Sequence, residues 1–121
     1  TPGGNVHWER ILSDILEQIP KNESFSYRVF DCGVMDLGDA VQVTPKTLNI
    51  LEGSYSTHPE LIGRYDLKIF LKTSPETQSA RILKRNGPAR HKMFVEKWIP
   101  LENLYFTSYP VEKQCDLVFT T

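Results

Sequence analysis

The chain has 121 residues, of which 40% are hydrophobic and 24% charged, and its formal net charge is −1. This length fits one domain or a piece of one, and the composition is ordinary for a globular protein. A net charge so close to zero excludes a general electrostatic attraction to nucleic acid or to anionic membranes. No apolar run is long enough to span a bilayer. We therefore expect a cytoplasmic protein whose anion-binding sites are local clusters.

The cysteines and histidines show no pattern of a metal site. Cys32 and Cys115 lie far apart and lack the spacing of a zinc or redox motif, so we expect two reduced structural thiols. The three histidines share no ligand spacing either, which argues against zinc.

The first predicted element is a helix that Asn5 caps, after a Thr-Pro-Gly-Gly loop. Its apolar residues recur at helical spacing, and Pro20 ends it. They are Ile11, Leu12, Ile15, Leu16 and Ile19.

Residues 25–44 predict a small antiparallel hairpin that projects from a larger sheet. Phe25, Tyr27 and Val29 occupy alternate positions, which is the period of a strand. Val41 and Val43 resume the alternation after a long connection that includes two glycines.

Further strands are predicted at 48–51, 67–71 and 115–119, the last of them buried, with helical segments between them. The segment 59–62 is expected to be a short helix. Ser74, Pro75 and Glu76 supply a capping hydroxyl, a proline at the first helical position and an acid in the first turn. A helix over 75–86 should follow and end at Asn-Gly-Pro.

A second helix should start near Ala89 and be kinked by Pro100. Its buried stripe is Phe94, Trp98, Leu101 and Tyr105. Strands that alternate with helices predict an α/β fold with a parallel sheet and helices on its faces.

Glu52 is the first candidate for chemistry, because it follows the predicted strand 48–51 directly. Open α/β sheets bind ligands at the carboxyl ends of their strands, where a carboxylate can hold Mg²⁺. The alternative is a solvated strand end at which Gly53 merely turns the chain.

The second candidate is a basic run over 81–92 that includes Arg81, Lys84, Arg85 and Arg90. Arg81 and Arg85 are four residues apart and share a helix face. A cationic segment beside a Gly-Pro break suits the neutralisation of charge during phosphoryl transfer. The alternative is that these cations only complement the dipole at the helix carboxyl end.

The hairpin offers the third candidate, with aromatic rings and a guanidinium beside a carboxylate. Such groups can hold a planar base or a sugar hydroxyl, and the alternative is strand packing with a surface ion pair. The residues are Tyr27, Arg28, Phe30 and Asp31.

Several segments, in this order, resemble the uridine kinase family of P-loop kinases, and most closely its loosely assigned bacterial uridine-kinase-like subgroup. Each motif is weak by itself, and the order carries the resemblance. The segments are residues 2–10, 27–31, 51–55, 65–71, 81–87, 98–103 and 115–118.

The resemblance implies an ATP-dependent kinase with a three-layer P-loop NTPase-like sheet, whose first strands are absent here, and a small hairpin. It implies Glu52 near Mg²⁺, and Arg81 and Arg85 as catalytic groups of a lid over the phosphates. Lys84 and Arg90 would bind the nucleotide. The four hairpin candidates would contact a nucleoside-like acceptor, although Met35 stands where uridine kinases have a base-contacting histidine.

The sequence contains no Gly-x-x-x-x-Gly-Lys-Ser/Thr loop to cradle phosphates. We therefore expect a truncated kinase that is inactive by itself. In the strand order of the family, the missing first strand lies between the strands predicted at 48–51 and 67–71. Its absence would leave unpaired strand edges, and a homodimer is one way to cover them. Rival readings are a loopless, pseudokinase-like nucleoside-binding module and a structural domain of a larger enzyme.

Overall fold

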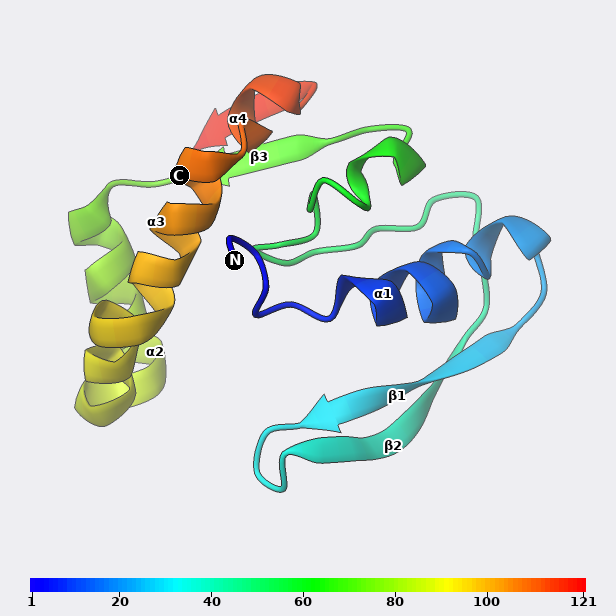
Figure 1. The fold of residues 1–121 in the computed structure, drawn as a ribbon, viewed down its shortest axis with the longest axis horizontal. Helices are drawn as coiled ribbons and strands as arrows, with labels where there is room; N and C mark the ends of the chain where they lie inside the picture. The colour runs from blue at the N-terminus through cyan, green and yellow to red at the C-terminus, as the bar shows by residue number, and fades with distance from the viewer. The chain divides into compact units, whose positions relative to one another are not determined.

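The computed structural model describes all 121 residues and divides into two compact units. Unit 1 comprises Thr1–Val6 and Ser54–Thr121, and unit 2 comprises His7–Gly53. Both are built from short elements, which make a mixed α/β structure with an antiparallel hairpin and a separate parallel strand pair (Figure 1). None of the helices combines the length and the apolar character that a bilayer crossing requires.

The helical part of unit 2 is less regular than the sequence suggested. Helix α1 (Trp8–Ile11) continues into a π-helical segment, η1 (Leu12–Leu16), and a 3-10 turn, η2 (Ile19–Lys21). The prediction that Asn5 caps this helix is wrong, because the helix starts three residues later and Asn5 belongs to unit 1. Leu16 is the buried residue of the predicted apolar stripe.

The predicted hairpin is confirmed in unit 2. Strand β1 (Phe25–Asp31) pairs antiparallel with β2 (Asp36–Val43), and residues 32–35 connect them, a shorter connection than expected. The pairs Arg28↔Ala40 and Phe30↔Leu37 show that β2 has one extra residue between them, which is a β-bulge. The hairpin forms a two-stranded sheet of its own and does not extend a larger one.

The predicted strand at 48–51 is absent, and these residues form irregular chain. A strand is held by hydrogen bonds to a neighbouring strand, and no strand pairs with this segment. Its apolar side chains are exposed, with Leu48 at 74% and Ile50 at 82%. The apolar pattern was therefore insufficient, because a strand also requires a partner.

Unit 1 contains two of the predicted strands, each shifted by a residue or two, and they pair in parallel. Strand β3 (Ile69–Lys72) lies parallel to β4 (Leu117–Thr120), which follows a short helix, α4 (Val111–Gln114). The prediction that this last strand is buried is wrong, since Phe119 is 51% exposed. Phe70 of β3 packs against Phe106, with their ring centroids 5.5 Å apart.

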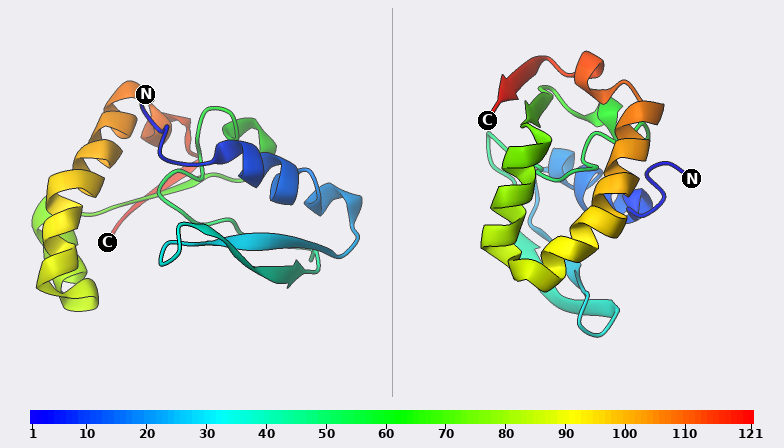
Figure 2. Two further views of the ribbon diagram at one scale, coloured as in Figure 1. Left: turned by 60° about the horizontal axis from the view of Figure 1, so that its bottom comes forward. Right: turned by 90° about the vertical axis from the view of Figure 1, so that its left-hand side faces the viewer.

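The helical hairpin of unit 1 follows the local signals closely. Helix α2 (Pro75–Met93) begins where Ser74 Oγ accepts the backbone N–H of Thr77 at 3.1 Å. Gly87 interrupts it with a φ of +82°, a conformation that favours glycine, so the expected break before Pro88 is confirmed. The two arms of the hairpin are seen in Figure 2. We call residues 75–86 the first arm and residues 88–108 the second arm.

The second arm contains a π-helical segment, η4 (Phe94–Trp98), which precedes α3 (Ile99–Ser108). The kink expected at Pro100 stays a prediction. Pro100 lacks a backbone N–H and lies in the first turn of α3, where a helix tolerates that loss. The segment at 59–62 is a turn that leads into a 3-10 turn, η3 (Ile62–Arg64), in place of the expected short helix.

An aromatic core holds unit 1 together around Tyr105, which is 0% exposed. Ring centroids of Tyr55, Phe106 and Tyr109 lie 4.9, 5.0 and 5.6 Å from that of Tyr105. The other buried residues of this core are Leu61, Val111, Ile82 and His58. Burial raises the pKa of Tyr105, and the nearby Thr57 side chain opposes part of that rise.

Burial also raises the pKa of Tyr65 to about 12, and the neighbouring Tyr105 adds to the effect. The Tyr65 hydroxyl donates a hydrogen bond to the carbonyl oxygen of Ser56. In the unfolded chain a tyrosine loses its proton near pH 10. Ionisation therefore favours the unfolded state progressively as the pH rises from about 10 to about 12.

We expect the ionisation of Tyr65 to lower the free energy of unfolding by about 2 kcal/mol between about pH 10 and about pH 12, in addition to the loss from Tyr105 and Cys115, whose pKa values are also raised. Urea titrations at a series of pH values measure the total loss. The Tyr65→Phe variant should lose the share that belongs to Tyr65. If variant and parent show the same pH dependence, Tyr65 is not the responsible group.

Candidate functional site

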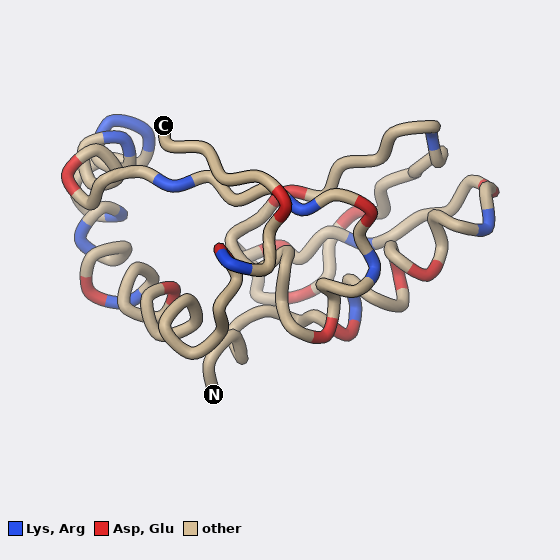
Figure 3. The backbone as a smooth tube through the Cα atoms, turned by 90° about the horizontal axis from the view of Figure 1, so that it is seen from above, with Lys and Arg blue, Asp and Glu red and all other residues tan.

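Two of the predicted arginines lie together in unit 1. Arg81 and Arg85 line one cavity of about 260 Å³. We call it the arginine cavity, and its remaining lining residues are Ser54, Thr73, Gln78, Ile82, Phe94 and Glu102. Because α2 brings residues four apart onto one face, the two guanidinium groups meet the same space. Basic positions recur along this part of the chain in Figure 3.

The two guanidinium groups differ in what they already contact. Arg81 donates from its two Nη atoms to Oγ1 and the carbonyl oxygen of Thr121, each at 3.1 Å, and so ties α2 to the residue that follows strand β4. Arg85 donates only from Nε, to Oδ1 of Asn86 at 2.7 Å. Its two Nη groups make no hydrogen bond within the chain. Arg85 is therefore the better placed of the two to bind an anion.

The other basic candidates do not line the arginine cavity. Lys84 and Arg90 are exposed, and neither contributes to its wall. On a helix, Lys84 points about 100° away from its neighbour Arg85, which accounts for the difference.

Glu52 is exposed, and the residues before it do not form a strand. The argument that its carboxylate lies at the ligand-binding end of a strand therefore does not apply. Along the chain it precedes Ser54, a residue of the arginine cavity, by two positions. The structure contains no group of three or more His, Cys, Asp or Glu side chains suited to a metal ion. Mg²⁺ that arrives with a nucleotide needs only one or two carboxylates, so Glu52 as its ligand remains a prediction.

Unit 2 has a cavity of its own, of about 280 Å³, which we call the hairpin cavity. Three of the four acceptor candidates line it, namely Tyr27, Arg28 and Phe30, whereas Asp31 does not. Asp31 instead accepts the backbone N–H of Gly33 at 2.7 Å, in the turn of the hairpin. The remaining lining residues are His7, Arg10, Ile11, Asp14, Ile15 and Val29.

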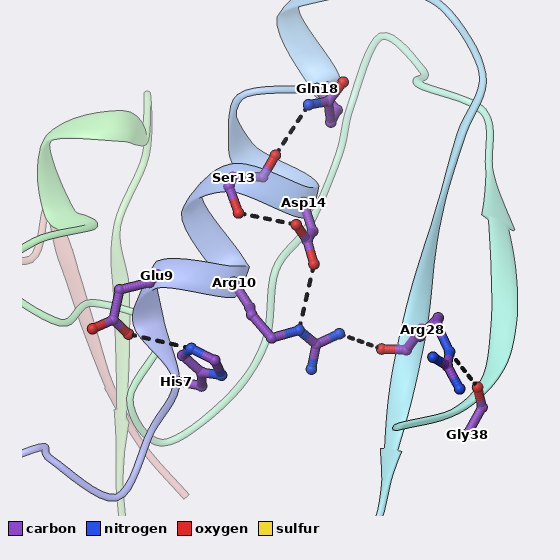
Figure 4. A network of polar contacts seen from close by, with 8 residues as sticks. All are labelled: His7, Glu9, Arg10, Ser13, Asp14, Gln18, Arg28 and Gly38. Atoms are coloured by element: carbon purple, nitrogen blue, oxygen red, sulfur yellow. Dashed lines mark hydrogen bonds and ion pairs between the residues drawn. The ribbon is translucent and has the colours of Figure 1, made fainter. Parts of the chain in front are cut away.

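A polar network borders the hairpin cavity (Figure 4). Arg10 lies 3.4 Å from the carboxylate of Asp14 through Nε and donates from Nη2 to the carbonyl oxygen of Arg28 at 2.6 Å. Arg28 donates to the carbonyl oxygens of Gly38 and Leu37, at 3.0 and 2.8 Å. These are carbonyls at the β-bulge, so Arg28 has an observed structural role there.

Several residues that line the arginine cavity were not predicted from the sequence. Gln78 was detectable, because it precedes Arg81 by three positions on the same helical face. Ser54, Thr73 and Glu102 come from distant parts of the chain, and no spacing rule connects them. The contact between Ser79 and His91, across the break in α2, was missed for the same reason.

Cys115 is half-buried and Cys32 is exposed, and both are free thiols. Burial raises the pKa of the Cys115 thiol, and the negative charge of Asp116 adds to this. A raised pKa disfavours the reactive thiolate, which suits a structural cysteine.

The chain matches no protein-family model. No curated protein matches it significantly either.

Proposed function

We propose that this chain belongs to an ATP-dependent phosphotransferase of the uridine-kinase type, which transfers the γ-phosphate to a nucleoside or a similar hydroxyl compound. The observation that carries the proposal is the arginine cavity, where Arg81 and Arg85 converge beside two hydroxyl groups. The order of sequence motifs supports it independently. In this reading the parallel pair β3 and β4 belongs to a P-loop NTPase-like sheet, and ATP and Mg²⁺ are the cofactors.

Arg85 has the chemistry that a phosphate group requires. A guanidinium group presents paired N–H donors that match two phosphate oxygens, and it stays charged at any working pH. The hydroxyl groups of Ser54 and Thr73 supply further donors on the same wall. In a phosphoryl transfer, such groups stabilise the negative charge that spreads over the transferred oxygens. Arg81, held by Thr121, contributes positive charge from a fixed position.

The hairpin cavity is the candidate acceptor site in this proposal. It offers the rings of Tyr27 and Phe30 to a planar base, and Phe30 is 46% exposed. A pocket of aromatic side chains with a few polar groups is a common form of small-molecule site. The guanidinium of Arg28 is occupied by backbone carbonyls, so the rings, rather than this cation, would bind the acceptor.

Inorganic tripolyphosphate, as a substitute for the tail of ATP, tests the anion site by calorimetry. We expect the Arg85→Ala variant to bind it roughly 10- to 100-fold more weakly, because a hydrogen bond to a charged group contributes about 1.5–3 kcal/mol. Lys92→Ala is the matched control, since this cation of α2 lies 3.9 Å from Glu96 and outside the cavity wall.

Equal binding by the Arg85→Ala variant and the parent would contradict the proposal. Uridine as a second probe distinguishes the kinase from the rival hypothesis, a nucleoside-binding module. Binding of uridine together with no binding of tripolyphosphate would favour a nucleoside-binding module over a kinase.

A further inference from the structure

A hydrogen bond joins the two arms of the helical hairpin in unit 1. The Oγ of Ser79, on the first arm, lies 2.7 Å from Nε2 of His91, on the second arm, and both side chains are partly buried. Twelve residues separate the two along the chain. The bond therefore spans the break in α2.

The break itself does little to fix the angle between the arms. Gly87 has a φ of +82° and a ψ of 171°, and a Cβ built on it would meet no atom within 4 Å. The next residue, Pro88, has no backbone N–H with which to continue the helical ladder. The orientation of the arms must therefore be set by contacts away from the break.

The arginine cavity depends on that orientation, because both arms contribute to its wall. Gln78, Arg81 and Arg85 come from the first arm, and Phe94 and Glu102 come from the second. A change in the angle would move the carboxylate of Glu102 and the ring of Phe94 relative to the two guanidinium groups. The shape and the charge of the cavity would change together.

We propose that Ser79 and His91 are positioning residues, whose hydrogen bond sets the angle between the arms and thereby shapes the arginine cavity for an anionic ligand. Neither side chain lines the cavity, so the pair acts through the residues that do. The ligand part of this inference rests on the proposed function. The structural part, that the bond orients the arms, does not.

The variants Ser79→Ala and His91→Leu each remove one partner. We expect faster amide hydrogen exchange over residues 86–98 in both, measured without ligand, and roughly threefold to tenfold weaker binding of tripolyphosphate. The double variant should be no worse than the worse single variant, because the two residues contribute one shared interaction. Ser79→Thr keeps the hydroxyl and should restore binding and exchange.

The matched control is Ser108→Ala, which removes the serine hydroxyl that donates to the carbonyl oxygen of Leu104 at 2.7 Å within the second arm. We expect it to change neither measurement. Melting temperatures check that each variant is folded at the assay temperature.

Unchanged exchange over residues 86–98 in Ser79→Ala would overturn the inference, as would single-variant effects that simply add in the double variant. If the parent protein fails to bind tripolyphosphate while exchange still responds to Ser79→Ala, the proposed function fails and the orienting role of the bond is supported. The proposed function and the orienting role of the hydrogen bond can therefore be contradicted independently.

Discussion

Replacing Tyr105 with alanine should lower the free energy of unfolding of unit 1 by about 3–5 kcal/mol, the usual cost of truncating a buried aromatic side chain. The side chain is fully buried and its ring contacts three further aromatic rings. Its removal leaves a cavity that these rings cannot fill without leaving their own contacts. A loss of this size is a large part of the stability of a small unit.

The two tryptophans allow the units to be followed separately, because Trp98 lies in unit 1 and Trp8 in unit 2. A Trp8→Phe background leaves Trp98 as the only indole reporter, and urea titration of its fluorescence gives the stability of unit 1. Tyr105→Phe is the control. It removes only the hydroxyl, which is buried without a hydrogen bond of good geometry, so we expect a change within about 1 kcal/mol. A loss below about 1 kcal/mol for Tyr105→Ala would show that Tyr105 is not central to this core.

Replacing Gly3 with alanine should cost about 2–4 kcal/mol, for two separate reasons. Gly3 has a φ of +73°, which other residues adopt only with strain. A Cβ at this position would lie 3.1 Å from Cδ2 of His58 and 3.1 Å from Cδ2 of Tyr105, closer than ordinary contact. Since His58 and Tyr105 are both buried, neither can move aside easily.

Gly63→Ala is the matched control for Gly3, because Gly63 is in the same unit and a Cβ there meets no atom within 4 Å. We expect its effect to stay within about 1 kcal/mol. The same Trp98 titration measures both variants. Equal stability of Gly3→Ala and the parent would mean that the first six residues do not pack on this core.

Local chemistry made parts of the fold predictable. Ser74, Pro75 and Glu76 indicated the start of α2, and Gly87 with Pro88 indicated its break, because capping and backbone freedom depend on a few neighbouring residues. The alternation of Tyr27 and Val29 indicated a strand, and the hairpin formed. The helical spacing of Arg81 and Arg85 also placed them correctly on one face.

Burial and pairing could not be predicted in this way. The apolar residues around Ile50 suggested a strand, yet no strand pairs with them, and Phe119 is half exposed although it was expected to be buried. Arg28 suggested a ligand contact, and the structure directs its guanidinium to the carbonyls of a bulge. A sequence pattern indicates which secondary structure or contact a residue favours. The residues that it actually contacts depend on the rest of the fold.

The sequence by itself determined where α2 begins and breaks, that the two halves of the hairpin are strands, and that Arg81 and Arg85 share one face of α2. Only the tertiary structure decided that Gly3 packs on Tyr105, that Ser54 and Glu102 join the arginines, and that Ser79 meets His91. The physical reason is the range of the interactions. Backbone dihedral preferences and caps act over a few residues, while a cavity or a core is made by side chains that the folded chain brings together from distant positions.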